Sequence, residues 1–99
     1  MKLNKAYTVS ELENILNAEC ISNSNNSFNT LSTMTNPIKG SLGFLTSDYN
    51  YDLSPFAGLI VDISFSKDIS KDILLFRTKN VSKSLSKLLY KIDNANGYL

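Results

Sequence analysis

The side chains that could do chemistry in this sequence are acids, lysines and tyrosines, because the chain contains no histidine. Histidine is the commonest general acid or base at neutral pH, so Ser–His and Cys–His catalysis and the usual zinc sites are excluded. Asp48 and Asp52 bracket two tyrosines and Asp62 ends an apolar run. Two aspartates supply fewer oxygen ligands than a calcium loop does. The sequence therefore favours binding over catalysis, and we expect no cofactor and no metal.

The other charged side chains and the single cysteine are typical of structural positions. Lys83, Lys87 and Lys91 recur at helical spacing and indicate a solvated helix face, with no glycine-rich loop nearby to complete a phosphate site. The three glutamates are interpreted as helix-surface charges, and Cys20 as a small buried apolar group. With a net charge of +1 and no long apolar run, we expect no nucleic-acid partner, no membrane span and a cytoplasmic location.

Residues with these roles need a scaffold, and 99 residues with 42% hydrophobic side chains suffice for one domain with a single core. A first helix is predicted from Val9 to Ala18, because Thr8 and Glu11 form a capping box at its start. A second helix is predicted after Asn80, which has the residue type of an N-cap. The apolar residues that repeat at helical spacing through it are Val81, Leu85, Leu88, Leu89 and Ile92.

Four strands are predicted between the two helices. Short strands are expected at Phe28–Met34 and Leu42–Leu45, and almost wholly apolar strands at Leu59–Ile63 and Ile73–Arg77. Continuous apolar runs indicate strands that are covered on both faces. The order predicts an α/β fold with a small mixed sheet of about four strands and two flanking helices. Because two helices provide little cover, we expect something outside this chain to cover part of the sheet.

Four stretches, read in order, carry a pattern found in one family of enzymes. They are Tyr7–Leu16 (YTVSELENIL), Phe28–Leu45 (FNTLSTMTNPIKGSLGFL), Gly58–Val61 (GLIV) and Ile73–Leu89 (ILLFRTKNVSKSLSKLL). In this order they resemble the N-terminal non-repeat domain of the UDP-3-O-(3-hydroxyacyl)glucosamine N-acyltransferases of lipid A synthesis. The N-terminal domain of the Mur ligases has a related fold and a similar early pattern. The resemblance implies a fold similar to both, without the catalytic β-helix of hexapeptide repeats that follows in the acyltransferases.

The resemblance also implies where a ligand would bind. In the family, a phenylalanine and a tyrosine sandwich the uracil of the UDP-sugar, and an asparagine reads the edge of the base. By position Phe44 matches the phenylalanine, Ser47 holds the asparagine position, and Asn50 holds the tyrosine position between Tyr49 and Tyr51. The implied ligand-binding residues are therefore Phe44, Ser47, Tyr49 and Tyr51, on a turn at the rim of the sheet. The alternative interpretation is that Phe44 belongs to the core and the tyrosines are loop residues.

The function that the resemblance implies is a nucleotide-sugar (UDP-acylglucosamine) binding or docking module. Its expected partners are a UDP-sugar and either a hexapeptide-repeat acyltransferase chain or a second copy of itself. Acyl transfer is not expected from these residues alone. The alternative is a ligand-free structural or interaction module of the same fold.

Overall fold

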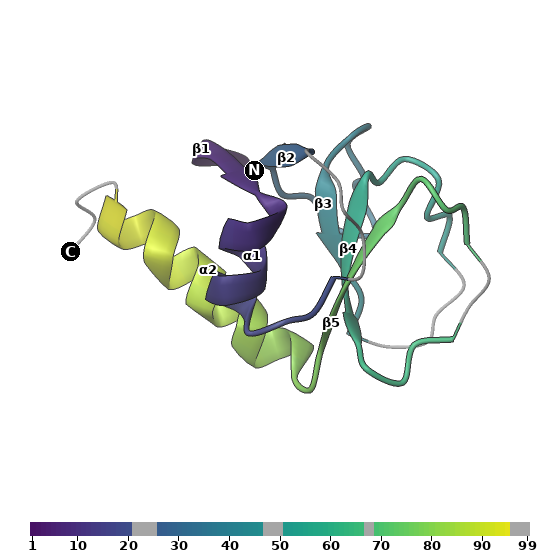
Figure 1. The fold of residues 1–99 in the computed structure, drawn as a ribbon. Coiled ribbons are helices and arrows are strands. Elements are labelled where there is room, and N and C mark those ends of the chain that lie inside the picture. Colours follow the sequence, from purple (N-terminus) through teal and green to yellow (C-terminus); the bar gives the residue numbers. More distant parts are fainter. Residues whose placement is uncertain (21–25, 47–50, 67–68, 96–99) are drawn as a thin grey trace.

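The computed structural model describes residues 1–20, 26–46, 51–66 and 69–95, which form a mixed α/β fold (Figure 1). These ranges contain two helices and five strands. In chain order the elements are β1 (Lys2–Thr8), α1 (Val9–Leu16), β2 (Ser27–Thr30), β3 (Leu42–Phe44), β4 (Gly58–Asp62), β5 (Leu74–Thr78) and α2 (Val81–Ala95). The predicted α/β class is confirmed, whereas the predicted count of four strands is one too few.

The five strands form two small sheets that are joined at one point. β1 and β2 are antiparallel, while β3, β4 and β5 are parallel and lie side by side in that order. A parallel bridge between Leu31 and Leu42 joins the two sheets, and the Ser32 N–H donates a hydrogen bond to the Leu42 carbonyl oxygen at 3.0 Å. Because β3, β4 and β5 are parallel, their carboxyl ends meet at the same edge.

Strand β1 is missing from the prediction because its side chains do not alternate. Leu3 and Tyr7 are buried, but Lys5, which alternation would place on the same face, is exposed. The register with β2 shifts between Lys2 and Tyr7, as at a β-bulge. Such an irregularity removes the two-residue period by which a strand is recognised in a sequence.

The other strands lie close to their predicted positions. β3, β4 and β5 begin and end within one residue of the predicted bounds. β2 ends at Thr30, four residues before the predicted end at Met34, because the chain turns between Thr33 and Asn36. The Asn36 N–H donates to the Thr33 carbonyl oxygen at 3.3 Å in this turn.

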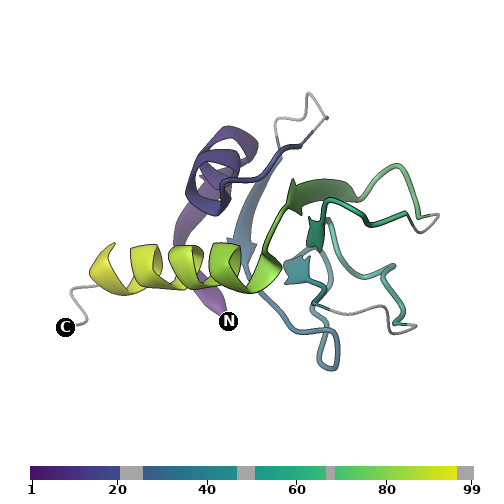
Figure 2. The same cartoon turned by 90° about the horizontal axis from the view of Figure 1, so that it is seen from below.

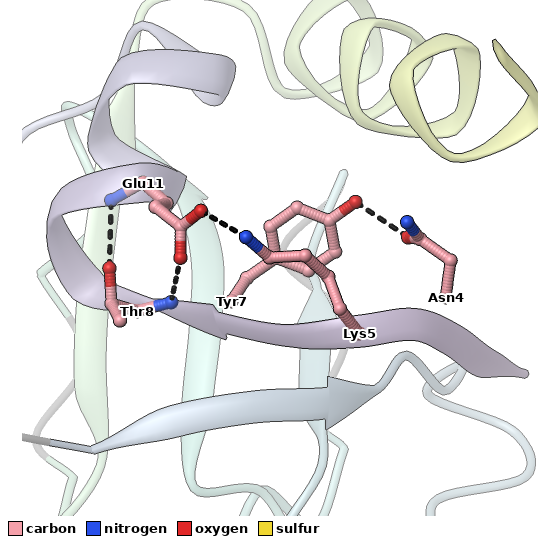
Figure 3. A network of polar contacts seen from close by, with 5 residues as sticks. All are labelled: Asn4, Lys5, Tyr7, Thr8 and Glu11. Carbon is pink, nitrogen blue, oxygen red and sulfur yellow. Dashed lines mark hydrogen bonds and ion pairs between the residues drawn. The ribbon is translucent and has the colours of Figure 1, made fainter. Parts of the chain in front are cut away.

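Helix α1 begins at the predicted capping box, which Figure 3 shows together with its neighbours. The Glu11 N–H donates to Thr8 Oγ1 at 3.2 Å, and the Thr8 N–H donates to Glu11 Oε1 at 3.1 Å. The helix ends at Leu16, two residues before the predicted end at Ala18. Asn17 ends it with a left-handed backbone, φ 51°, a conformation that asparagine adopts more readily than most residues.

The two helices lie on one face of the β3–β4–β5 sheet, and loops lie on the other (Figures 1 and 2). On the helix side, Leu12, Leu16 and Leu88 belong to one core cluster with Ile60 and Phe76 of the sheet. On the loop side, a second cluster consists of Leu45, Leu53, Phe56, Leu59, Val61, Phe65 and Ile73. The sheet is therefore the middle of three layers.

The chain itself covers both faces of its central strand. Leu59, Ile60 and Val61 of β4 are each 0% exposed. The loops that precede β4 and β5 supply the cover on the side without helices, with Phe56 buried in the loop before β4. For β4, cover from outside the chain is not needed, and for the rest of the sheet the expected outside cover stays a prediction.

Candidate functional site

A cleft of about 380 Å³ opens where the parallel strands end and α2 begins. Thr46 follows β3, Asp62 is the last residue of β4, and Lys79 follows β5. Each strand thus contributes at least one polar side chain to the same hollow. Open parallel sheets bind their ligands at this edge, outside the carboxyl ends of the strands. We therefore take this cleft, called the strand-end cleft below, as the candidate site.

One wall of the strand-end cleft carries a carboxylate that is held in place by the backbone turn after β4. Asp62 Oδ2 accepts a hydrogen bond from the Ser64 hydroxyl, and a second from the Ser64 N–H at 2.9 Å. These two hydrogen bonds, the hydroxyl bond first, hold the pKa of Asp62 below its usual value. Asp62 is therefore ionised at neutral pH and acts toward a ligand as a hydrogen-bond acceptor.

The start of α2 also lines the strand-end cleft. The Lys83 N–H donates to Asn80 Oδ1 at 3.0 Å, which confirms Asn80 as the N-cap of this helix. Lys79 and Ser82, on either side of the cap, are exposed and line the cleft. This part of the cleft thus offers an ammonium group and a hydroxyl group to a ligand.

Buried apolar side chains complete the strand-end cleft. Leu45, Phe65 and Val81 line it and are each less than a tenth exposed. A hollow with a few polar groups placed around an apolar base is the usual form of a small-molecule site. The lining suits a ligand that has hydroxyl groups, an anionic group and an apolar ring.

Of the four predicted ligand-binding residues, the structure describes Phe44 and Tyr51, and it does not bring these two together. Phe44 packs against the helix-side core cluster, whereas Tyr51 packs against the loop-side cluster. Their side chains are therefore associated with opposite faces of the sheet. Ser47 and Tyr49 lie outside the described residues. Leu45, the neighbour of Phe44, is the residue that reaches the strand-end cleft, as strand alternation requires.

Phe44 instead lines a separate apolar groove of about 290 Å³. This groove, called the Phe44 groove below, also contains Leu31 and Ile38 and the α2 residues Leu85 and Leu89. Phe44 is half-buried there, and Ile38 is 43% exposed. The predicted aromatic residue thus lies beside an open apolar surface rather than in the strand-end cleft.

Asp52 and Cys20, which the sequence also singled out, have structural surroundings. Asp52 Oδ1 accepts hydrogen bonds from the Ser54 hydroxyl at 2.7 Å and the Ser54 N–H at 3.1 Å, and these bonds lower the pKa of Asp52. Its predicted companion Asp48 lies outside the described residues. Cys20 is buried in the helix-side cluster, as predicted, and its N–H donates to Glu13 Oε2 at 3.1 Å.

Sequence reasoning missed most of the strand-end cleft. The sequence marks Asp62 only as the end of an apolar run, and it assigns no role to Thr46, Ser64, Lys79 or Ser82. A signal was present, because polar residues directly follow each of three apolar strand segments. This pattern predicts a site only once the three strands are known to be parallel neighbours.

No three acidic or cysteine side chains in the described ranges lie close enough together to hold a metal ion. Among the helices described, neither combines the length and the hydropathy that crossing a membrane requires.

Comparison of the sequence with models of known protein families, and with curated proteins, finds no match. The resemblance to the acyltransferases therefore depends on the order of the four sequence stretches alone. The geometry of the strand-end cleft is independent of that resemblance.

Proposed function

We propose that this chain is a binding module that takes a nucleotide sugar in the strand-end cleft. The observation that carries the proposal is the convergence of Asp62, Lys79 and Ser82 at the edge where three parallel strands end. The sequence resemblance supports a UDP-acylglucosamine as the ligand, and with it a place in lipid A synthesis in the cytoplasm. We do not propose acyl transfer by this chain, which in the resembling family belongs to a separate β-helix.

The chemistry of the cleft fits the parts of such a ligand. The ionised Asp62 accepts hydrogen bonds from the hydroxyl groups of a ribose or a sugar, and Ser82 adds a hydroxyl that can donate or accept. Phe65 and Leu45 offer apolar contact to a ring. Phe44 has no part in this proposal, since it lines the Phe44 groove.

Isothermal titration calorimetry with UDP-N-acetylglucosamine tests the proposal. We expect saturable binding by the unmodified chain and its loss in Ser82→Tyr, because the larger side chain fills the cleft. Ser86→Tyr is the matched control, since Ser86 is exposed one turn further along α2 and does not line the cleft. If no heat of binding saturates at millimolar ligand, or both variants lose binding equally, the proposal is wrong.

A second candidate function is a structural or interaction module of the same fold without a small-molecule ligand. The Phe44 groove favours it, because apolar side chains there remain open to solvent. The partner would be a second copy of the chain or a hexapeptide-repeat acyltransferase chain. Light scattering coupled to size exclusion tests self-association: a dimer that becomes a monomer in Ile38→Lys would support it. A monomer at every concentration would contradict self-association.

A further inference from the structure

The net charge of +1 conceals an uneven distribution of charge along the chain. Residues 77–91 contain five of the ten cationic side chains and no acidic one. The rest of the chain has five cations and nine acids, and is therefore net acidic. A segment of one sign concentrates an anion near it more than the net charge would suggest.

The structure gathers four of these cations around one hollow. A groove of about 620 Å³, called the basic groove below, is lined by Arg77, Lys79, Lys83 and Lys87. Glu19 is the acidic residue in its lining. The cations therefore outnumber the acids by four to one among the residues that line it.

Two features fix the positions of charges in the basic groove. A nitrogen of the Arg77 guanidinium group donates to the Phe65 carbonyl oxygen at 2.6 Å, which restrains that side chain. The backbones of Arg77 and Glu19 exchange two hydrogen bonds of 2.9 Å each, which holds the segment after α1 beside β5. A restrained guanidinium group loses less conformational entropy when it binds an anion.

The basic groove adjoins the strand-end cleft. Lys79 and Asn80 line both hollows, so a ligand that extends past them from the cleft enters the groove. The two hollows differ in charge, since the cleft contains the Asp62 carboxylate and the groove contains four cations. Lys79 also lines the cleft and offsets Asp62 there, so a phosphate group is attracted more strongly by the groove than by the cleft.

We infer that the basic groove binds the diphosphate of the nucleotide sugar, while the nucleoside occupies the strand-end cleft. This inference rests on the proposed function and assigns the phosphates to Lys83, Lys87 and Arg77, which line the groove and not the cleft. Lysine and arginine side chains make charge-assisted hydrogen bonds to phosphate oxygens, which are stronger than bonds between neutral groups.

Calorimetry with uridine, UDP and inorganic pyrophosphate at low salt tests the inference. We expect UDP to bind on the order of tenfold more tightly than uridine, because the phosphates add charge-assisted hydrogen bonds. The double variant Lys83→Gln/Lys87→Gln should lose most of this advantage and bind uridine as the unmodified chain does. The control variant Lys39→Gln/Lys91→Gln removes the same charge from residues that line neither hollow. It should still bind UDP more tightly than uridine.

The outcomes separate this inference from the proposed function. If uridine and UDP bind with equal affinity, the diphosphate assignment is wrong, while nucleoside binding is left intact. The same holds if both double variants lose the tighter binding of UDP equally. Pyrophosphate binding that requires Lys83 and Lys87, without any binding of uridine, would support the basic groove and overturn the proposed function. Absence of binding by all three compounds would overturn both.

Discussion

The carboxylate of Glu11 joins β1 to α1, and its contacts depend on its charge (Figure 3). It accepts hydrogen bonds from Lys5 Nζ and from the Thr8 N–H, and the Lys5 bond is the larger cause of its lowered pKa. The same lysine lies over the ring of Tyr7, with Nζ 5.2 Å from the ring centroid. This network is structural, since it orders the first turn of the helix.

The pH dependence of unfolding tests the role of Glu11. The pKa of Glu11 is lowered in the folded state. Its contribution to the stability of the fold is therefore complete above the pKa that Glu11 has in the unfolded chain, and it is lost as pH falls through the folded pKa. Between about pH 5 and pH 3, Glu11→Gln should therefore lose less stability than the unmodified chain in urea unfolding. Glu19→Gln, which removes an exposed carboxylate outside this network, is the control. An unchanged pH profile in Glu11→Gln would contradict this role.

Single residues of the candidate site were hard to predict because they are distant in sequence. Thr46, Asp62 and Lys79 meet because three strands are parallel neighbours, and nothing local to any of them indicates this. The resemblance directed attention to Phe44, whose side chain faces the other way. The capping residues Thr8 and Glu11 were predictable because their partners are three positions apart.

At the scale of elements, Ser84 connects three of them through buried hydrogen bonds. Its hydroxyl donates to the Leu16 carbonyl oxygen at 2.6 Å and lies 2.7 Å from the Thr78 hydroxyl. It thereby ties α2 to the end of α1 and to the end of β5. Thr78 and Ser84 line the basic groove, so the contact also holds in place the elements that carry its cations.

Replacing Ser84 should destabilise the fold. Ser84→Ala leaves buried polar groups without this partner, and we expect a loss of about 1–3 kcal/mol in the free energy of unfolding. Ser86→Ala, on the exposed face of the same helix, should change it by less than about 0.5 kcal/mol. Urea unfolding measures both. Equal losses in the two variants would show that the buried hydrogen bonds of Ser84 do not stabilise the contact of α2 with α1 and β5.

Strand β3 requires a glycine at its centre. A Cβ atom on Gly43 would lie 2.5 Å from Cε1 of Phe56 and 2.9 Å from Cε of Met34, closer than atoms can pack. We expect Gly43→Ala to reduce the free energy of unfolding by about 1–3 kcal/mol. A double-mutant cycle with Phe56→Leu should recover part of this loss, because the smaller side chain makes room. If the losses in the free energy of unfolding caused by the two substitutions simply add, the close contact between Gly43 and Phe56 is contradicted.

The elements themselves were mostly predictable, because apolar runs and helical spacing are local patterns. Strand β1 was not, because the shift in its register hides the alternation of its side chains. The position of the helices was also unpredictable. Both pack on one face of the sheet, whereas the sequence predicts only that two helices flank it.

At the scale of the whole molecule, loops cover the face of the β3–β4–β5 sheet that the helices leave open. Leu53, Phe56 and Phe65 come from connections between parallel strands, and they bury Leu59 and Val61 from the side without helices. Thr46, Ser64 and Phe65, in the described parts of these connections, line the strand-end cleft at the carboxyl edge of the sheet. The layers of the fold and the position of the candidate site thus both follow from one arrangement, in which parallel strands are linked by packed loops.

The central claim is that the strand-end cleft binds a nucleotide sugar, and backbone NMR shifts during a titration with UDP-N-acetylglucosamine test it most directly. We predict saturable shifts at Thr46, at Asp62–Phe65 and at Lys79–Ser82, with none at Ile38 in the Phe44 groove. Spectra that stay unchanged at millimolar ligand, or shifts confined to the Phe44 groove, would contradict it.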